Sequence, residues 1–170
     1  MNASQQQTSQ TAAAPLVTAA GAGSVYDFPA FGHRIFSKVS TRDTGGAFAV
    51  GEVVAEKKGG VPPHIHSREE ETFYVLDGRF EFQIGDETIE AGVGDTVFAP
   101  RDLMHTWRCV GETPGRFLLF ITPGADFEAF ANEMAQRNLV PARDMADPTL
   151  AAQFMALTEQ YGIEMLPPVK

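Results

Sequence analysis

Three of the four histidines and one glutamate are spaced so that their side chains can meet. His64 and His66 are separated by one residue, and in an extended segment residues two apart face the same side. Pro62 and Pro63 stand directly before this pair and favour an extended backbone. We therefore expect both imidazoles to point toward one place.

Glu71 and His105 are each expected to open a strand with an apolar inward face. Glu71 shares its face with Phe73 and Val75, so its carboxylate enters the core if they do, and a buried carboxylate needs a partner. His105 shares its face with Trp107. Three imidazoles and one carboxylate inside a core would satisfy one another best around a divalent metal, because the ion cancels charge that is costly to bury.

Each of these residues also has a simpler explanation when it is taken alone. A His-x-His pair can lie on the wet face of a sheet, and the acidic run at residues 69–71 can form a charged turn. Only the strand phase favours Glu71 over Glu70 as the inward residue, and His105 alone could be a core histidine. The combination favours the metal site, and His33 has no partner in the sequence and no assigned role.

The elements that must position these residues are short strands. From Tyr26 to Pro123, alternating apolar residues and turn residues indicate an all-β sandwich or barrel. Asp77-Gly78 and Gly85-Asp86 stand between alternating runs and favour hairpins. The expected strands are 34–40, 48–56, 71–76, 79–84, 87–90, 96–99, 104–110 and 117–121.

Beyond Pro123 the apolar spacing changes to about 3.6 residues, which predicts helices. Asp126 can cap the first helix; the second has Asp147 as its cap, Pro148 at its first position and Gly162 as its stop. Both apolar stripes are interpreted as packing faces. They are Phe127, Phe130, Ala131 and Met134 in the first helix, and Leu150, Phe154, Leu157 and Tyr161 in the second.

Composition excludes several classes of protein. A chain of 170 residues with 44% hydrophobic residues suits one domain. No apolar run is long enough to cross a membrane, and a net charge of -9 disfavours nucleic acid as a partner. Cys109 is the only cysteine, so neither an internal disulfide nor a cysteine-rich zinc site can form.

The first 24 residues carry no charged and no aromatic side chain, which predicts a mobile N-terminal arm. They also lack the features of a secretory signal or a transit peptide, so the cytoplasm is the expected location. Alternatively, the arm adds to a neighbouring subunit through residues 15–17. The expected organisation is an arm at 1–24, a β-barrel at 25–123 and a helical extension at 124–170.

A longer motif surrounds the first ligand candidates. His64 and His66 are followed by Glu71 and then by Gly78. This order resembles the first motif of the cupins, in which a His-x-His pair, a glutamate and a glycine follow one another.

The second ligand segment resembles the second cupin motif. Gly94-Asp95 leads through Pro100 to His105, and the whole resemblance covers about residues 45–123. It departs from the cupin pattern at residues that shape turns rather than at ligand positions: Gly59, Gly60, Asp102 and Cys109.

The resemblance implies a single cupin double-stranded β-helix, or jelly-roll barrel, followed by two C-terminal α-helices. It implies that His64, His66, Glu71 and His105 bind one divalent metal (Fe, Mn, Ni, Co, Cu or Zn) and leave coordination positions open for catalysis. The order of barrel and helices resembles the quercetin 2,3-dioxygenase-like group. Two copies are expected to pair as a homodimer through a sheet face that presents Val53, Tyr74 and Leu76, unless the helices cover that face.

The expected function is a metal-dependent dioxygenase that cleaves a hydroxylated aromatic or enol-type substrate with O2, with Glu71 as general base. The alternatives are a metal-dependent isomerase, lyase or hydrolase of small metabolites, or a non-catalytic binding module. An apolar, aromatic interior favours a flat substrate. The expected pocket residues are Phe73, Phe80, Phe82, Trp107 and Phe117.

Overall fold

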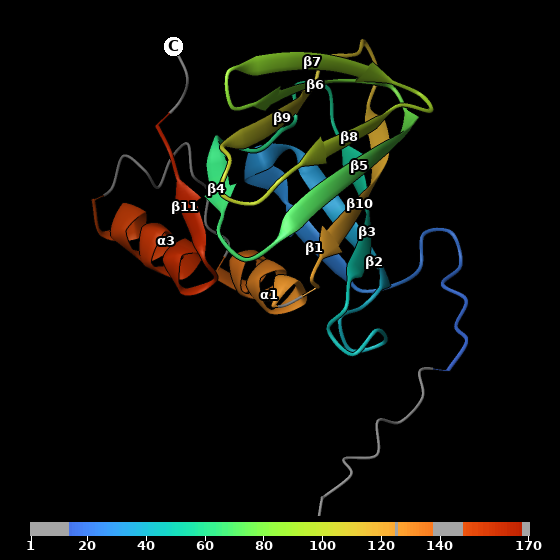
Figure 1. Cartoon of the computed structure of the whole chain (residues 1–170), viewed down its shortest axis with the longest axis horizontal. Helices are drawn as coiled ribbons and strands as arrows, with labels where there is room; N and C mark the ends of the chain where they lie inside the picture. Colours follow the sequence, from blue (N-terminus) through green and yellow to red (C-terminus); the bar gives the residue numbers. More distant parts are fainter. Residues whose placement is uncertain (1–13, 125, 138–147, 168–170) are drawn as a thin grey trace, which may run out of the picture.

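Two antiparallel sheets form the body of the molecule (Figure 1). The computed structural model describes residues 14–124, 126–137 and 148–167. One sheet has the order β1 (Val25–Phe28), β2 (His33–Val39), β3 (Ala49–Ala55), β10 (Gly115–Thr122), β5 (Glu70–Asp77), β8 (Thr96–Ala99). The other has the order β11 (Ile163–Met165), β4 (His64–His66), β9 (His105–Cys109), β6 (Arg79–Ile84), β7 (Glu87–Gly92). The all-β prediction with two C-terminal helices is confirmed.

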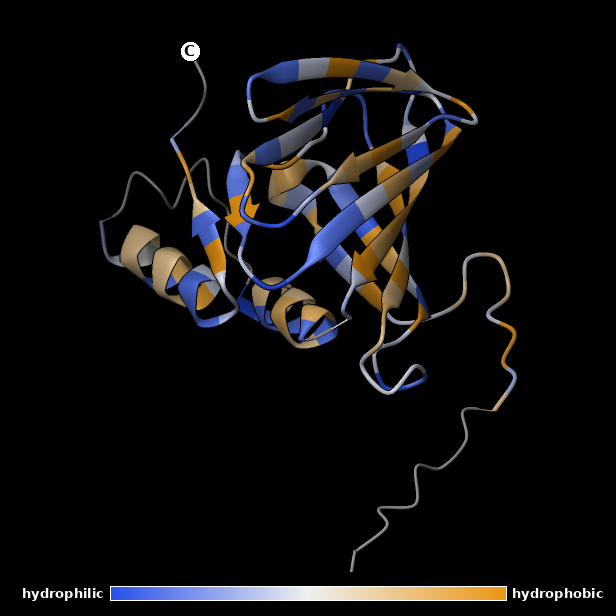
Figure 2. Ribbon diagram, viewed as in Figure 1, coloured by the Kyte–Doolittle hydropathy of each residue, from blue (hydrophilic) through white to orange (hydrophobic). Residues whose placement is uncertain are grey.

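The core lies between the two sheets. Hydrophobic and hydrophilic residues alternate along the strands (Figure 2), which buries one face of each strand and leaves the other toward solvent. Phe73 and Phe117 from one sheet meet Phe80 and Phe82 from the other, with the Phe80 and Phe117 ring centroids 5.0 Å apart. All four rings are fully buried, so this aromatic cluster fixes the spacing of the two sheets.

Every strand that the sequence predicts is present within two residues of its expected ends. Three elements were not predicted: β1, the short 3-10 helix Pro29–Phe31, and β11. A fourth, β4, was expected only as an extended segment and not as a strand of the sheet. Strands of three or four residues carry too little alternation to be recognised locally, and β1 and β11 exist because β2 and β4 offer them a partner edge.

The two predicted helices are α1 (Phe127–Arg137) and α3 (Pro148–Gln160), and Figure 1 shows α3 beside β11. Ala131 and Met134 of α1 are buried, as are Phe154 and Leu157 of α3, so the stripes pack as interpreted. Asp147 and the side chain of Leu150 lie outside the described residues. In the described part of the chain, no helix is long and apolar enough to cross a membrane.

The N-terminal arm is described only from residue 14. Its backbone follows β2: Thr18 Oγ1 donates to the Lys38 carbonyl at 2.7 Å, and the Ser37 amide donates to the Ser24 carbonyl at 2.9 Å. Leu16 and Val17 are exposed. Residues 1–13 lie outside the described residues, and the mobility of the arm stays a prediction.

One residue of the expected outward face lies inside instead. Val53 is 1% exposed, because its cross-strand neighbours are Ile35 and Phe117, both of which are buried. The pair Val53-Val54 gives no alternation from which to read the phase. Tyr74 is 39% exposed and does face outward; the pairing of two copies through this face stays a prediction.

Candidate metal centre

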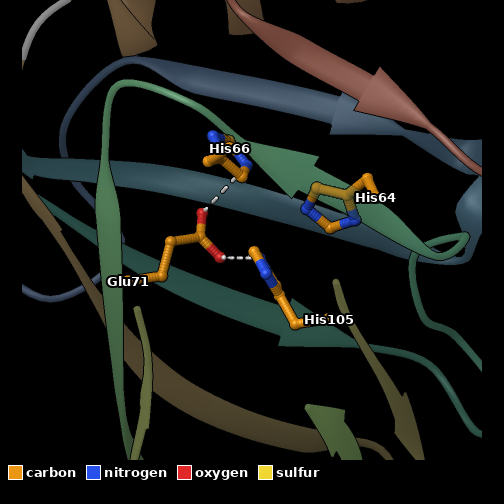
Figure 3. Close-up of side chains that lie close together, drawn as sticks. All are labelled: His64, His66, Glu71 and His105. Carbon is orange, nitrogen blue, oxygen red and sulfur yellow. Dashed lines mark hydrogen bonds and ion pairs between the residues drawn. The ribbon is translucent and has the colours of Figure 1, made fainter. Parts of the chain in front are cut away.

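Four buried side chains from three strands converge at one end of the sandwich (Figure 3). His64 and His66 come from β4, Glu71 from β5 and His105 from β9. One potential ligand atom from each residue lies within 4.8 Å of the others. The structure therefore brings together the four residues that the sequence selects.

Strand β4 aims its two histidines inward because it is paired on both sides. His64 is the cross-strand partner of His105 in β9, and their ring centroids are 4.4 Å apart. On the other edge, Ile163 pairs with His66 and Met165 pairs with His64. The C-terminal strand β11 thus fixes the backbone that carries two of the four candidate ligands.

Each of the three rings is held through its Nδ1 atom. Nδ1 of His64 donates to the Pro62 carbonyl at 2.8 Å, and Nδ1 of His105 donates to the Leu103 carbonyl at 3.1 Å. Nδ1 of His66 lies 3.2 Å from a carboxylate oxygen of Glu69. Carbonyl and carboxylate oxygens accept hydrogen bonds, so they place the ring proton on Nδ1 and leave Nε2 as the lone pair that can bind a metal.

Both carboxylate oxygens of Glu71 face these Nε2 atoms. Oε2 lies 3.2 Å from Nε2 of His105, and Oε1 lies 3.7 Å from Nε2 of His66 (Figure 3). When the rings are neutral, lone pairs face lone pairs across these distances and repel. A cation held among them removes the repulsion, so the donor set fits a divalent metal.

Comparison with known sequence families agrees with this geometry. Residues 51–121 match the family described as a cupin domain. This part of the chain is similar to cupin domains. The matched segment contains all four candidate ligands.

The relatives of this chain show its fold more than its chemistry. Polyketide synthase CurC from Streptomyces cyaneus is 30% identical over 63 residues, which are 37% of this chain and 41% of that protein. The structure of KdgF from Halomonas sp. has a TM-score of 0.59 at 21% identity and covers 68% of this chain and 99% of that one. An RmlC-like cupin from Shewanella frigidimarina has a TM-score of 0.58 at 16% identity, covering 68% and 96%.

Burial and mutual charge set the protonation states within this site. Burial and the neighbouring histidines lower the pKa of His64 to about 3, so this ring is neutral at neutral pH. Burial raises the pKa of Glu71, but attraction to His66, the close contact with His105 and the nearby His64 outweigh burial and bring the pKa to about 2. Burial alone would lower the pKa of His66. The carboxylates of Glu71 and Glu69 raise it by more, so the pKa lies above its usual value. An anionic Glu71 and a neutral His64 are the forms that bind metals.

A cavity of about 100 Å³ adjoins the cluster, and His64, His66 and Glu71 form part of its wall. Most of the remaining wall is apolar and comes from both sheets and from the C-terminal extension. Helices α1 and α3 contribute Phe127, Phe130 and Phe154, so the helical extension forms part of the cavity wall beside the candidate metal centre.

The expected pocket residues divide into two groups. Trp107 lines the cavity. Phe73, Phe82 and Phe117, together with Phe80, lie in the aromatic cluster between the sheets and do not reach the cavity wall. The apolar lining of the cavity comes instead from the edge strands and helices: Phe28, Phe31, Phe127, Phe130 and Phe154.

Sequence reasoning missed two residues of this region. Glu69 is 6% exposed and bonds His66; its place three residues after His66 is the only local signal. His33 is also 6% exposed and lines the cavity. No local signal marks His33, because β2 and β9 bring it to Trp107 from 74 residues away in sequence.

Proposed function

We propose that this chain is a metal-dependent enzyme that acts on a hydroxylated aromatic or enolic small molecule. The observation that carries the proposal is the buried cluster of three histidines and one glutamate in the wall of an otherwise apolar cavity. A cluster that served only to stabilise the fold would not need a cavity beside it.

His64, His66, Glu71 and His105 would hold the metal, and their imidazole and carboxylate donors suit Fe, Mn, Co, Ni, Cu or Zn. A metal bound there would supply Lewis acidity toward a substrate oxygen. Four protein ligands leave room in a six-coordinate shell, which is typical of catalytic rather than structural sites.

Protein groups would perform the proton transfer and the orientation. Glu71 is anionic and can accept the proton of a substrate hydroxyl, and its Oε2 lies 3.2 Å from Nε2 of His105. Trp107 and Phe28 present flat apolar surfaces to the cavity. The helices add apolar side chains to the cavity wall, so a charge formed on the substrate would be less screened by solvent.

The reaction that we propose is dioxygenation. Loss of a proton makes a phenol or enol electron-rich, and the resulting anion reacts with O2, both atoms of which enter the ring-opened product. The resemblance to the quercetin 2,3-dioxygenase-like group supports this choice. The test is O2 consumption with flavonols by protein loaded in turn with each of the six metals, with His105→Ala as the control. Absence of O2 uptake with every metal would reject the dioxygenase.

A second candidate is a non-oxidative conversion of an enolic substrate, such as an isomerisation or a ring closure. It is favoured by the similarity to a polyketide synthase, since polyketides carry enolisable carbonyl groups. Because this chain matches only 41% of that relative, the substrate is part of the proposal. Turnover that proceeds equally with and without O2 would select this candidate.

A further inference from the structure

His33 is a buried polar residue in the cavity that the proposed metal chemistry does not use. It opens β2 and is the cross-strand neighbour of Phe28 in β1 and of Ala55 in β3. Its ring centroid lies 5.1 Å from that of Phe28 and 5.2 Å from that of Trp107. His33 is only 6% exposed and forms part of the wall of the same cavity as His64.

The Nδ1 atom of His33 is buried and makes no hydrogen bond of acceptable geometry among the described residues, although the backbone carbonyls of Phe31 and Gly60 act on the ring and raise its pKa. All four histidines lie in the described ranges, and the other three each engage Nδ1 with a carbonyl or a carboxylate. A phenylalanine would fill the same space between Phe28 and Trp107 without an unsatisfied nitrogen. A buried polar atom without a partner destabilises the fold, so its presence in a cavity wall points to a ligand.

We propose that His33 is a second recognition point of the cavity, which hydrogen-bonds a hydroxyl of the ligand at a distance from the metal cluster. The inference rests on the proposed function, because it assumes that the cavity binds the substrate. A neutral imidazole has one donor and one acceptor nitrogen. A hydroxyl can donate to the imidazole or accept from it, whereas a carbonyl can only accept and an ammonium can only donate.

The position of His33 defines the shape of the ligand. Trp107 contacts His33 and stands two residues from His105 on β9, which places its Cα roughly 7 Å from that of His105 along the strand. The walls between the two polar points are aromatic and apolar. The ligand class that fits two polar points separated by an apolar wall is a flat aromatic molecule with two hydroxyls set apart on its rings.

Calorimetric binding of two probes to zinc-loaded protein tests this inference. The probes are a naphthol with one hydroxyl and a naphthalenediol with hydroxyls at opposite ends of the rings. Wild-type protein should bind the diol about tenfold more tightly than the naphthol. His33→Phe keeps the ring packing and should reduce that ratio to near one, while its zinc content stays unchanged. Phe130→Leu, a change in the apolar wall, should weaken both probes and keep the ratio.

A second measurement covers the case in which His33→Phe does not fold. The ¹⁵N resonances of the His33 ring in the wild-type protein should shift with the diol and not with the naphthol. His33→Asn, which retains a polar atom close to the ring, should keep part of the preference.

Equal binding of both probes by the wild type, an undiminished ratio in His33→Phe, or no binding of either probe would overturn the inference. O2 uptake and turnover measured on the same samples separate the two proposals. If turnover is absent and the diol preference depends on His33, the proposed reaction fails and the recognition role remains. If turnover is present and His33→Phe keeps the ratio, only the role of His33 is rejected.

Discussion

The carboxylate of Glu69 lies 3.2 Å from Nδ1 of His66, and both side chains are buried. The contact fixes the orientation of the His66 ring and turns its Nε2 toward Glu71. A carboxylate that accepts from the far nitrogen also makes an imidazole a better metal ligand. Glu69 therefore belongs to the metal centre although it is not one of the candidate ligands.

Replacement of Glu69 by alanine should weaken metal binding by about 10- to 100-fold, because the His66 ring loses its orientation and part of its basicity. The adjacent Glu70 provides a matched control. Its carboxylate pairs with Arg101 at 3.3 Å near the surface, so Glu70→Ala should leave the metal affinity within about twofold. Competition titrations against a chelator measure both variants, and equal affinities would show that Glu69 has no part in the site.

The strand β11 should be required for the metal site as well as for stability. Ile163 is 6% exposed and pairs with His66, whereas Glu164 is exposed and pairs with Ile65. Ile163→Ala should cost about 2–5 kcal/mol in the free energy of unfolding, and it should lower metal affinity in protein that is still folded. Glu164→Ala should change stability by no more than about 0.5 kcal/mol. Urea unfolding and metal titration of both variants check this prediction. Unchanged metal affinity in folded Ile163→Ala would show that β11 is not required for the metal site.

Stability of the metal-free protein should fall as the pH is lowered. Burial lowers the pKa of His33 from 6.5 to about 4, and the Phe31 carbonyl and the charge of Asp27 oppose this shift only in part. In the unfolded chain His33 therefore takes up a proton near pH 6.5, whereas in the folded chain it does so only near pH 4. The free energy of unfolding should drop by up to about 3 kcal/mol across this window on account of His33.

The contribution of His33 is read as a difference, because His64 also has a lowered pKa and acts in the same direction. Urea unfolding of the wild type and of His33→Phe, each at about pH 7 and about pH 4.5, isolates the contribution of His33. The variant should lose less stability between the two pH values. An identical loss in both proteins would mean that His33 is not held neutral in the fold.

Alternation along the chain was sufficient to predict eight of the strands and the inward faces of Glu71 and His105. The same local logic placed His64 and His66 together, since two residues of one strand share a face. It could not identify β1 and β11, whose few residues become strands through their partners. For the same reason the lining of the cavity by His33 and the helices was missed: contacts between distant segments leave no local pattern.

The second limit of sequence reasoning was the phase of strand alternation, which decides whether a residue faces inward or outward. Val53 follows no clear alternation and lies inside the barrel rather than outside. Phe73, Phe82 and Phe117 were expected at the cavity, yet they pack against each other between the sheets. Alternation tells which face of the sheet a residue occupies, and it does not tell how far along the barrel axis the cavity extends.

The central claim is that His64, His66, Glu71 and His105 together bind a divalent metal. Elemental analysis of protein purified without chelator tests it most directly, with His105→Ala purified in parallel. The account predicts about one transition-metal ion per wild-type chain and little or none in His105→Ala. A wild-type protein that holds no metal even after incubation with each of the six candidate ions, or a His105→Ala variant that holds as much as the wild type, would contradict it.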